Sequence, residues 1–278
     1  MAINNIVVIS DIHAGCKLAI CPPCGVGLDD GGYYKPSMTV SKLYDWWAEF
    51  WGEFVPEATR GEPYAVVMNG DATDGVHHGS TTQISHNLVD QSRIAGLLLK
   101  PVVALCEGRY YHIRGTEAHV GASGVEEERL AETLKARPND QGQFARWDLR
   151  IRCGPRLCHI THHIGTAGSM AYESSGPMRE LVESLNDSAK WGNEAPDVVV
   201  RSHRHRCIMV ESPSRNGRAI VAVTPGWQLK TPFVYRIVGG RNATPMIGGI
   251  VIRYAHDRIF VDPFVRNITP VEPEICNA

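Results

Sequence analysis

With 278 residues, the chain can form one large domain or two small ones, and its 43% hydrophobic content is ordinary for a globular protein with a sizeable core. The formal net charge of −2 excludes a basic surface that grips nucleic acid along its whole length, although a local basic patch is still compatible with it. No apolar run is long enough to cross a membrane and the first residues do not resemble a signal peptide, so we expect a soluble protein of the cytoplasm.

The first predicted strand ends in two polar side chains. Residues 7–15, VVISDIHAG, begin as a short continuous apolar run, which is typical of a strand covered on both faces in a parallel sheet. Asp11 and His13 follow at its carboxyl end, and residues two apart in an extended chain point to the same side. We therefore expect both side chains to converge just beyond the strand, at the edge where open α/β sheets place their ligands.

A long loop rich in glycine and proline, residues 14–38, comes next. Cys21 and Cys24 form a CPPC sequence within it, and Cys16 lies nearby. Two alternatives to a plain loop are open: a zinc site, which needs a fourth ligand, and a redox pair, which usually lies between a strand and a helix. Because the sequence offers neither a second CxxC nor that setting, we prefer a loop of reduced thiols.

The elements that follow alternate between helix and strand. A helical segment at 39–55 places tryptophan and phenylalanine on one apolar face, which we expect to pack on a sheet rather than to bind a partner. A buried strand at 65–71, a helix near 89–106 and a third strand at 109–116 come after it. The next helix, near 124–137, begins with several glutamates, as the helix dipole favours. This alternation is the signature of βαβ units.

The second half of the chain is richer in hairpins. In order, the sequence predicts a hairpin at 147–163, a helix near 177–191, a buried strand at 197–203, and hairpins at 208–223 and 248–264. There is no repeat and no obvious linker. We therefore expect a single domain, residues 1–278, that contains two sheets, with the hairpins of residues 206–270 completing the second sheet.

Five of the predicted strands deliver acidic or imidazole side chains at their carboxyl ends. These are Asp11 and His13; Asp71 and Asp74; Glu117 and His119; His162 and His163; and His203 and His205. A single buried histidine is usually a core residue, but five such strand ends in register need compensation for desolvated charge. Divalent metals provide it, and oxygen and imidazole ligands suit Zn, Mn or Fe.

The ordered set of motifs resembles the calcineurin-like metallophosphoesterases. It consists of D-x-H, G-D-x-x-D, a glycine-to-histidine element, an isolated histidine and H-x-H, and it spans residues 11–205. The resemblance implies a four-layer α/β/β/α sandwich of two mixed sheets, which agrees with the βαβ half and the hairpin half of the chain. It also implies two divalent metal ions (Mn, Fe or Zn), of which Mn is expected to support activity.

By this resemblance, the metal ligands are Asp11, His13 and His205 for the first ion, Asp71 as a bridge, and His162 and His203 for the second ion. A carboxylate suits the bridging position because its two oxygens serve two cations about 3.5–4 Å apart. Such a pair lowers the pKa of a shared water, which gives hydroxide near neutral pH.

The third strand departs from the family pattern. The family usually has Gly-Asn-His followed by an acid, with the asparagine as a ligand, whereas this chain has Gly-Thr-Glu-Ala-His. Either Thr116 or Glu117 replaces the amide, or the second metal is weakly held. His163, His77 and His78 are further candidates, although each is more often a plain loop residue.

The resemblance also suggests residues for catalysis and substrate binding. His119 would be the general acid, with Asp74 holding its imidazole in place. Arg114 and Arg204 are candidates for binding phosphate, although an arginine beside a buried strand is often only a solvated flank. The long loops after the first and second strands should overhang the metal edge. The first of these loops and the tryptophan-rich helix also resemble metallophosphoesterases encoded by bacteriophages, which would act in the host cytoplasm.

Three functions are compatible with these features. The first is a dinuclear metal-dependent phosphoesterase that hydrolyses a phosphomonoester or a small phosphodiester by metal-bound hydroxide. The second is a nuclease like the DNA-repair members of the same family, favoured by the RSHRHR sequence at 201–206 and disfavoured by the net charge. The third is a non-catalytic scaffold that binds protein through the tryptophan-rich helix, but loss of catalysis should erase ligands that this chain retains.

Overall fold

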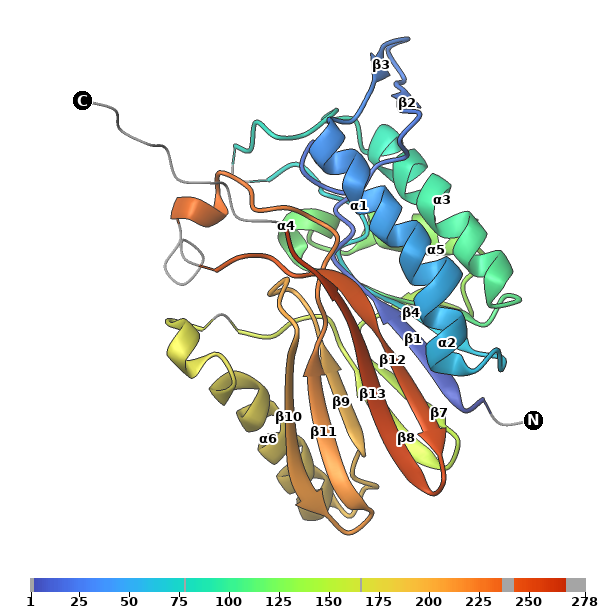
Figure 1. The fold of residues 1–278 in the computed structure, drawn as a ribbon, viewed down its shortest axis with the longest axis vertical. Coiled ribbons are helices and arrows are strands. Elements are labelled where there is room, and N and C mark those ends of the chain that lie inside the picture. The colour runs from blue at the N-terminus through green and yellow to red at the C-terminus, as the bar shows by residue number, and fades with distance from the viewer. Residues whose placement is uncertain (1–2, 78, 166, 237–242, 269–278) are drawn as a thin grey trace.

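Two mixed β-sheets face each other in the computed structural model, and helices cover their outer faces (Figure 1). The structure describes residues 3–77, 79–165, 167–236 and 243–268. Among these residues, no helix is long and apolar enough to cross a membrane.

The first sheet has the strand order β13-β12-β1-β4-β5-β6. Its strands are β1 (Asn5–Ile9), β4 (Ala65–Asn69), β5 (Tyr110–Ile113), β6 (Ala145–Arg146), β12 (Ile247–Ala255) and β13 (Arg258–Arg266). Four neighbouring strands of this sheet, β1, β4, β5 and β6, are parallel, as the βαβ pattern predicts. Their carboxyl ends therefore share one edge. The helices on its outer face are α1 (Met38–Glu49), the π-helical turn η1 (Phe50–Phe54), α2 (Val55–Thr59), α3 (Leu88–Leu105) and α5 (Val125–Thr133).

The second sheet has the order β10-β11-β9-β8-β7. Its strands are β7 (Leu149–Cys153), β8 (Arg156–Ile160), β9 (Val198–Arg201), β10 (Ile208–Ser214) and β11 (Gly217–Val223), and α6 (Ser175–Trp191) covers its outer face. The shorter elements are the hairpin of β2 (Val26–Gly27) and β3 (Tyr33–Tyr34), the helix α4 (Glu117–Val120), and the 3-10 turns η2 (Met170–Tyr172) and η3 (Val234–Arg236).

The alternation of side chains along the strands creates the layers. In β1, Ile6 and Val8 join the apolar cluster between the two sheets, whereas Val7 and Ile9 join the cluster beneath the helices. In the second sheet, Val199 faces Leu181 of α6. Each sheet is therefore apolar on both faces, which gives the four-layer α/β/β/α sandwich that the sequence predicts.

The tryptophan-rich helix is part of the core. Trp46, Trp47 and Trp51 are each less than a tenth exposed. The ring of Trp47 lies 4.8 Å from that of Trp227, in an edge-to-face arrangement. The prediction that this helix packs on a sheet is confirmed, and these tryptophans are not available as a surface for a protein partner.

One part of the predicted topology is wrong. The hairpin at 208–223 does join the second sheet, but the last hairpin, β12 and β13, extends the first sheet, where β12 pairs antiparallel with β1. Ile250 and Ile252 of β12 lie in the cluster between the sheets and Val251 lies in the cluster beneath the helices. A strand that is apolar on both faces fits the interior of either sheet, so turn signals alone could not decide between them.

The CPPC segment lies in a loop, with both cysteines as free thiols. Cys24 is exposed, whereas Cys21 is buried, and burial raises the pKa of the Cys21 thiol to about 12. A thiol with so high a pKa is a poor metal ligand and a poor redox nucleophile, which favours the plain-loop interpretation.

Candidate metal centre

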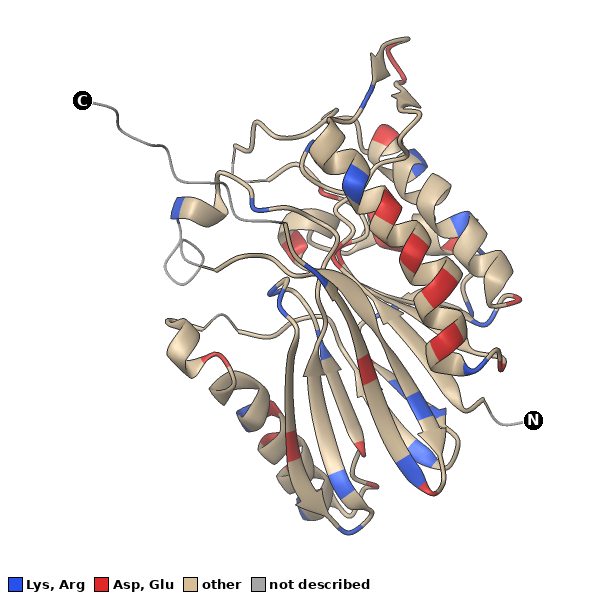
Figure 2. Cartoon of the chain, in the orientation of Figure 1, with Lys and Arg blue, Asp and Glu red and all other residues tan. Residues whose placement is uncertain are grey.

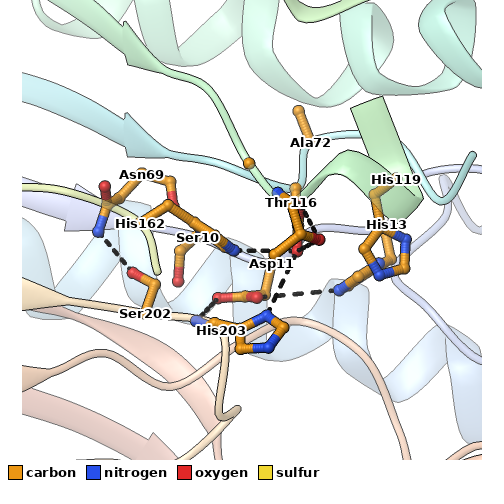
Figure 3. Close-up of polar contacts among 12 residues, drawn as sticks. Ser10, Asp11, His13, Asn69, Ala72, Thr116, His119, His162, Ser202 and His203 are labelled. Carbon is orange, nitrogen blue, oxygen red and sulfur yellow. Dashed lines mark hydrogen bonds and ion pairs between the residues drawn. The ribbon is translucent and has the colours of Figure 1, made fainter. Parts of the chain in front are cut away.

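The polar strand ends of both sheets meet at one edge of the molecule (Figure 3). The described residues contain three groups of three side chains whose ligand atoms lie within 4.8 Å of one another, and one of them consists of His13, Asp74 and His119. The other two, called the first and second groups below, are Asp11, His13 and His205, and Asp71, His162 and His203. These are the six residues that the family resemblance assigns to the two metal ions. Each of these two groups draws residues from both sheets, because Asp11, His13 and Asp71 follow β1 and β4, whereas the three histidines at 162, 203 and 205 follow β8 and β9.

In the first group, two imidazoles face one carboxylate oxygen. The Nε2 atom of His205 lies 3.4 Å from Oδ1 of Asp11, and the Nε2 atom of His13 lies 3.8 Å from the same oxygen. The two Nε2 atoms are 3.1 Å apart. Three ligand atoms thus surround one point, and the other oxygen of Asp11 accepts a hydrogen bond from the backbone N–H of His203 at 3.2 Å.

In the second group, the orientation of one histidine is fixed by the backbone. Nδ1 of His162 lies 2.6 Å from the carbonyl oxygen of Asn69, to which it donates, and this turns its Nε2 atom toward Asp71 at 3.0 Å. Nδ1 of His203 lies 4.0 Å from the same Asp71 oxygen. A histidine whose Nδ1 donates to a carbonyl presents Nε2 as a metal ligand, which is the usual arrangement in metal sites.

The buried atoms of these groups lack other partners. Within the described residues, Oδ1 of Asp11 and Nε2 of His162 are buried and accept or donate no hydrogen bond. Leaving such groups unsatisfied costs roughly 1–3 kcal/mol each, and more when they are charged. Carboxylate and imidazole donors in this arrangement fit two divalent cations, which would satisfy both atoms.

The backbone is strained at five of the six residues. Asp11, His13, Asp71, His203 and His205 have φ angles of 52°, 45°, 55°, 70° and 50°, in the left-handed region. For a residue other than glycine this conformation costs roughly 1–2 kcal/mol. Strain of this kind persists only where the surroundings impose it, and it clusters at functional sites.

The charges of the site shift the pKa values of its residues. Burial disfavours the charged form of His13, but the carboxylates of Asp11 and Asp74 outweigh it and raise the pKa to about 10. Burial likewise opposes the charge on His162, yet Asp71 raises its pKa to about 9. Despite burial, the facing imidazoles hold the pKa values of Asp11 and Asp71 well below the usual range. Without a cation, His13 and His162 therefore carry positive charge in the site.

Thr116, and not Glu117, lies at the place of the family's asparagine. The backbone N–H of Thr116 donates to Oδ1 of Asp71 at 2.8 Å, and its hydroxyl lies 3.2 Å from both oxygens. Glu117 is exposed and belongs to neither group, which corrects its proposed role as a ligand. The reason is local: Thr116 is the N-cap of α4, so the chain turns into a helix and carries Glu117 away from the edge.

His119 and Asp74 are neighbours, but not in the predicted way. Nδ1 of His119 donates to the backbone carbonyl of Asp74 at 2.6 Å, not to its carboxylate. The carboxylate instead lies 3.4 Å from Nδ1 of His13 and accepts hydrogen bonds from Gln83 and Gln228. Asp74 thus orients a candidate ligand with its side chain and His119 with its backbone. Burial and the charge of His13 lower the pKa of His119 to about 4.

The two predicted arginines have different surroundings. Arg204 lines a cavity of about 420 Å³ that opens over the two groups, whereas Arg114 does not line it. Arg114 donates to Glu128 at 3.0 Å and to the carbonyl of Ser123 at 3.1 Å, so its prediction as a phosphate ligand is corrected. The strand end that carries Arg114 turns the side chain toward α5 rather than toward the cavity.

Three other histidines were candidate ligands. His77 lines the cavity, and its ring lies 4.4 Å from that of His119. His163 is exposed, with its ring 5.0 Å from that of His203. His78 lies outside the described residues.

A chain of buried hydroxyls beneath the site was not anticipated from the sequence. The hydroxyl of Thr224 lies 2.7 Å from that of Ser10 and 2.6 Å from that of Ser202. The amide of Asn69 donates to Ser202 at 2.6 Å. These residues come from the ends of β1, β11, β9 and β4. Their hydrogen bonds therefore connect the two sheets directly below the ligands. Their only signal in the sequence is a small polar residue after an apolar run.

The role of Glu127 also differs from the one that the sequence indicated. Its position among the glutamates at the start of a helix suggested only a favourable interaction with the helix dipole. Glu127 is fully buried, and its two oxygens accept hydrogen bonds from the backbone N–H groups of Ala72 at 2.9 Å and Gly115 at 2.6 Å. Ala72 follows Asp71, and Gly115 precedes Thr116. Glu127 therefore fixes the two loops that carry the bridging candidate and its hydrogen-bond donor.

Gly115 allows the loop after β5 to lie close against Asp71. A Cβ atom at this position would lie 2.0 Å from Oδ1 of Asp71, which no rotamer change of a flexible neighbour could relieve. The glycine of this motif is therefore set by the space that the Asp71 carboxylate occupies.

Comparisons with known proteins leave the family undecided. No protein-family model matches the sequence, and no curated protein matches it. Solved structures that resemble it include vacuolar protein sorting 29 from Cryptosporidium parvum, with 9% identity, a TM-score of 0.41 and 95% and 98% of the two chains covered. A Thermotoga maritima protein has 11% identity, a TM-score of 0.37 and coverage of 95% and 100%. A metallophosphoesterase from Sphaerobacter thermophilus has 10% identity, a TM-score of 0.38 and coverage of 94% and 88%. At such values these likenesses assign neither a ligand nor a reaction to this chain.

The raised pKa values predict that cation binding releases protons. His13 and His162 have pKa values of about 10 and about 9, so both are protonated near pH 7 and must lose a proton before they can bind a metal. We expect about two protons per molecule to be released on saturation with Mn²⁺, and the apparent affinity to rise with pH up to about pH 10, the pKa of His13. Calorimetric titration in buffers of different ionisation enthalpy measures this release. Binding without proton release would contradict the assignment of these two ligands.

Substitution of Glu127 should weaken the second cation site. In Glu127→Gln one of the two backbone N–H groups loses its acceptor, and the loop that carries Asp71 loosens. We expect Mn²⁺ affinity at one of the two sites to fall about 10–100-fold, as for other residues that support ligands. Glu128→Gln is the matched control, because Glu128 also accepts two backbone N–H groups, from Phe144 and Ala145, but away from the site. Equal metal affinities in the two variants would leave Glu127 with a purely structural role.

Proposed function

We propose that this protein is a metallophosphoesterase of the calcineurin-like family that uses two divalent cations to hydrolyse a small phosphate ester. The observation that carries the proposal is the pair of ligand groups, each composed of residues from both sheets, of which His13, Asp71, His203 and His205 line one cavity. The order of the same residues in the sequence supports it, because four separate strand ends supply them.

In this proposal, Asp11, His13 and His205 hold one cation, His162 and His203 hold the other, and Asp71 bridges them. When bound, the two cations supply an activated water and polarise the phosphate oxygens. Thr116 fixes the Asp71 carboxylate, because it donates two hydrogen bonds to it. Asp74 holds the imidazole of His13 with its carboxylate at 3.4 Å.

The chain also provides a proton donor and an anion-binding group. His119 lines the cavity and donates from Nδ1 to the carbonyl of Asp74, so Nε2 is unprotonated in the neutral imidazole that a pKa of about 4 gives near pH 7. To act as the acid, His119 must take up a proton at Nε2 and donate it to the departing oxygen. Arg204 lines the cavity and donates to the carbonyls of Gly165 and Glu173. Since these acceptors are neutral, its positive charge is not cancelled by them and attracts the phosphate.

The basic sequence at 201–206 does not favour a nuclease. Arg201 is buried and donates to Glu180 at 3.1 Å, and Arg206 donates to both carboxylate oxygens of Glu173. Over the rest of the described chain, basic and acidic positions are interspersed on both sheets and their helices (Figure 2). The burial of the tryptophans likewise removes the main support for a protein-binding scaffold. A small ester is the better fit to the cavity.

Loss of the bridging carboxylate should abolish most hydrolysis. Asp71→Asn removes one negative charge and one ligand oxygen from both proposed cation sites. We expect the Mn²⁺-supported kcat for nitrophenyl phosphates to fall at least about 100-fold, because loss of supporting residues alone typically costs 10–100-fold. Asp187→Asn, an exposed acid of α6, is the control and should retain full activity. Chelation of the metal should inactivate the wild type, and undiminished turnover in protein shown by elemental analysis to be metal-free would refute the mechanism.

The role of His119 should depend on the leaving group. His119→Gln removes the proton donor, so alkyl phosphate esters should lose about 10²–10⁴-fold in kcat, whereas nitrophenyl esters, whose leaving group needs little protonation, should lose far less. His86→Gln, an exposed histidine that does not line the cavity, is the control. Because the pKa of His119 is lowered to about 4, its protonated fraction falls as pH rises, and the alkyl-to-aryl rate ratio of the wild type should fall too. Equal losses on both classes would show that His119 is not the acid.

A further inference from the structure

The cavity over the metal edge has an apolar wall as well as a polar floor. Its polar floor includes the candidate ligands His13, Asp71, His203 and His205 together with His119, whereas Met170, Leu229, Phe233, Val234 and Pro245 form its apolar lining. These apolar residues come from two separate segments: the turn η2 after β8, and the stretch around η3 after β11. Both turns lie on the same side of the molecule, near the open ends of the sheets (Figure 1).

Two of these side chains are large, apolar and partly exposed. Met170 is 47% exposed and Phe233 is 38% exposed, although both line the cavity. Keeping large apolar groups in contact with water is unfavourable, and where they gather at the mouth of a polar cavity they mark a binding surface. The floor needs no such wall to bind a phosphate, so the wall points to the organic part of the ligand.

The charged groups of the wall fit one anion rather than a polyanion. Arg206 is neutralised by Glu173, with its guanidinium donating to both carboxylate oxygens at 2.6 and 3.0 Å. Arg204, which donates only to carbonyls, keeps its charge, and it follows His203 directly. Lys230 also lines the cavity, between the wall residues Leu229 and Phe233, with its ammonium 4.1 Å from the centre of the Tyr235 ring. The wall thus offers mainly apolar contact, with one lysine beside it.

We propose, on the basis of the proposed function, that the cavity selects phosphate esters that carry one compact aromatic group, such as a phenyl ring or a nucleobase. The phosphate would lie at the metal edge beside Arg204, and the aromatic group would pack against Met170 and Phe233. A cavity of about 420 Å³ is in the range of sites for small molecules, so this ligand is a single small ester and not a nucleic-acid strand. Met170 and Phe233 would then determine specificity without taking part in the reaction.

Two phosphonates that cannot be hydrolysed test this inference. Phenylphosphonate and methylphosphonate carry the same anionic group and differ in the aromatic ring. With Mn²⁺-loaded full-length protein, calorimetry should show phenylphosphonate binding at least about 10-fold more tightly than methylphosphonate, as burial of a ring against apolar side chains predicts. Phe233→Ala and Met170→Ala should each reduce this preference and leave the affinity for methylphosphonate within about twofold of the wild type.

Tyr172→Ala is the matched control, because Tyr172 lies in the same turn as Met170, is 70% exposed and does not line the cavity. It should keep the full preference. Equal affinities of the wild type for the two phosphonates, or a preference that survives both Phe233→Ala and Met170→Ala, would overturn the aromatic specificity and leave the proposed function intact. Failure of both phosphonates to bind would overturn the proposed function itself, and this inference with it.

Discussion

Asp11 and Asp71 are almost completely buried carboxylates, and most of the surrounding structure compensates for their charge. Each faces imidazoles, and each also receives a backbone N–H, from His203 and from Thr116. To bring these groups together, the chain turns left-handed at five candidate ligands directly after its strands. Such strain is stable only where several independent contacts impose the same geometry, and Glu127, Gly115 and the hydroxyl chain supply those contacts.

Each ligand group also joins the two halves of the fold. The first combines side chains after β1 with His205, and the second combines Asp71 with His162 and His203 of the other sheet. Neither group exists until the apolar cluster between the sheets has formed. A cation bound at either group would therefore cross-link the sheets, and its binding free energy would add to the stability of the whole sandwich. The hydroxyl chain through Thr224 makes the same connection with hydrogen bonds.

The sequence was most informative where one residue carries a strong local signal. Buried strands that end in Asp or His predicted the polar edge, because strand direction determines where a carboxyl end lies, and the family resemblance selected the six side chains that meet there. It was least informative where the outcome depends on tertiary contact. Glu117 and Arg114 lie at the right strand end but point elsewhere, since the start of α4 and the contact with Glu128 decide their direction. Glu127 and the last hairpin were misassigned for the same reason.

The site thus has two parts with different physical origins. The ligands stand on strand ends held by hydrogen bonds from both sheets, and such support is rigid enough to keep charged groups within a few ångströms of one another. The apolar wall of the cavity comes from the segments around η2 and η3. The second segment is tied to the ligand edge, because Gln228 donates to Asp74 and the backbone N–H of Trp227 donates to the carbonyl of Asp11, but these bonds do not involve Met170 or Phe233. On the proposed function, the reaction chemistry would reside in the edge between the sheets, whereas the choice of substrate would reside in the turns that line the cavity. A fold organised in this way keeps one kind of chemistry while its substrate changes, because substitutions at Met170 or Phe233 leave the buried charges and their hydrogen bonds untouched.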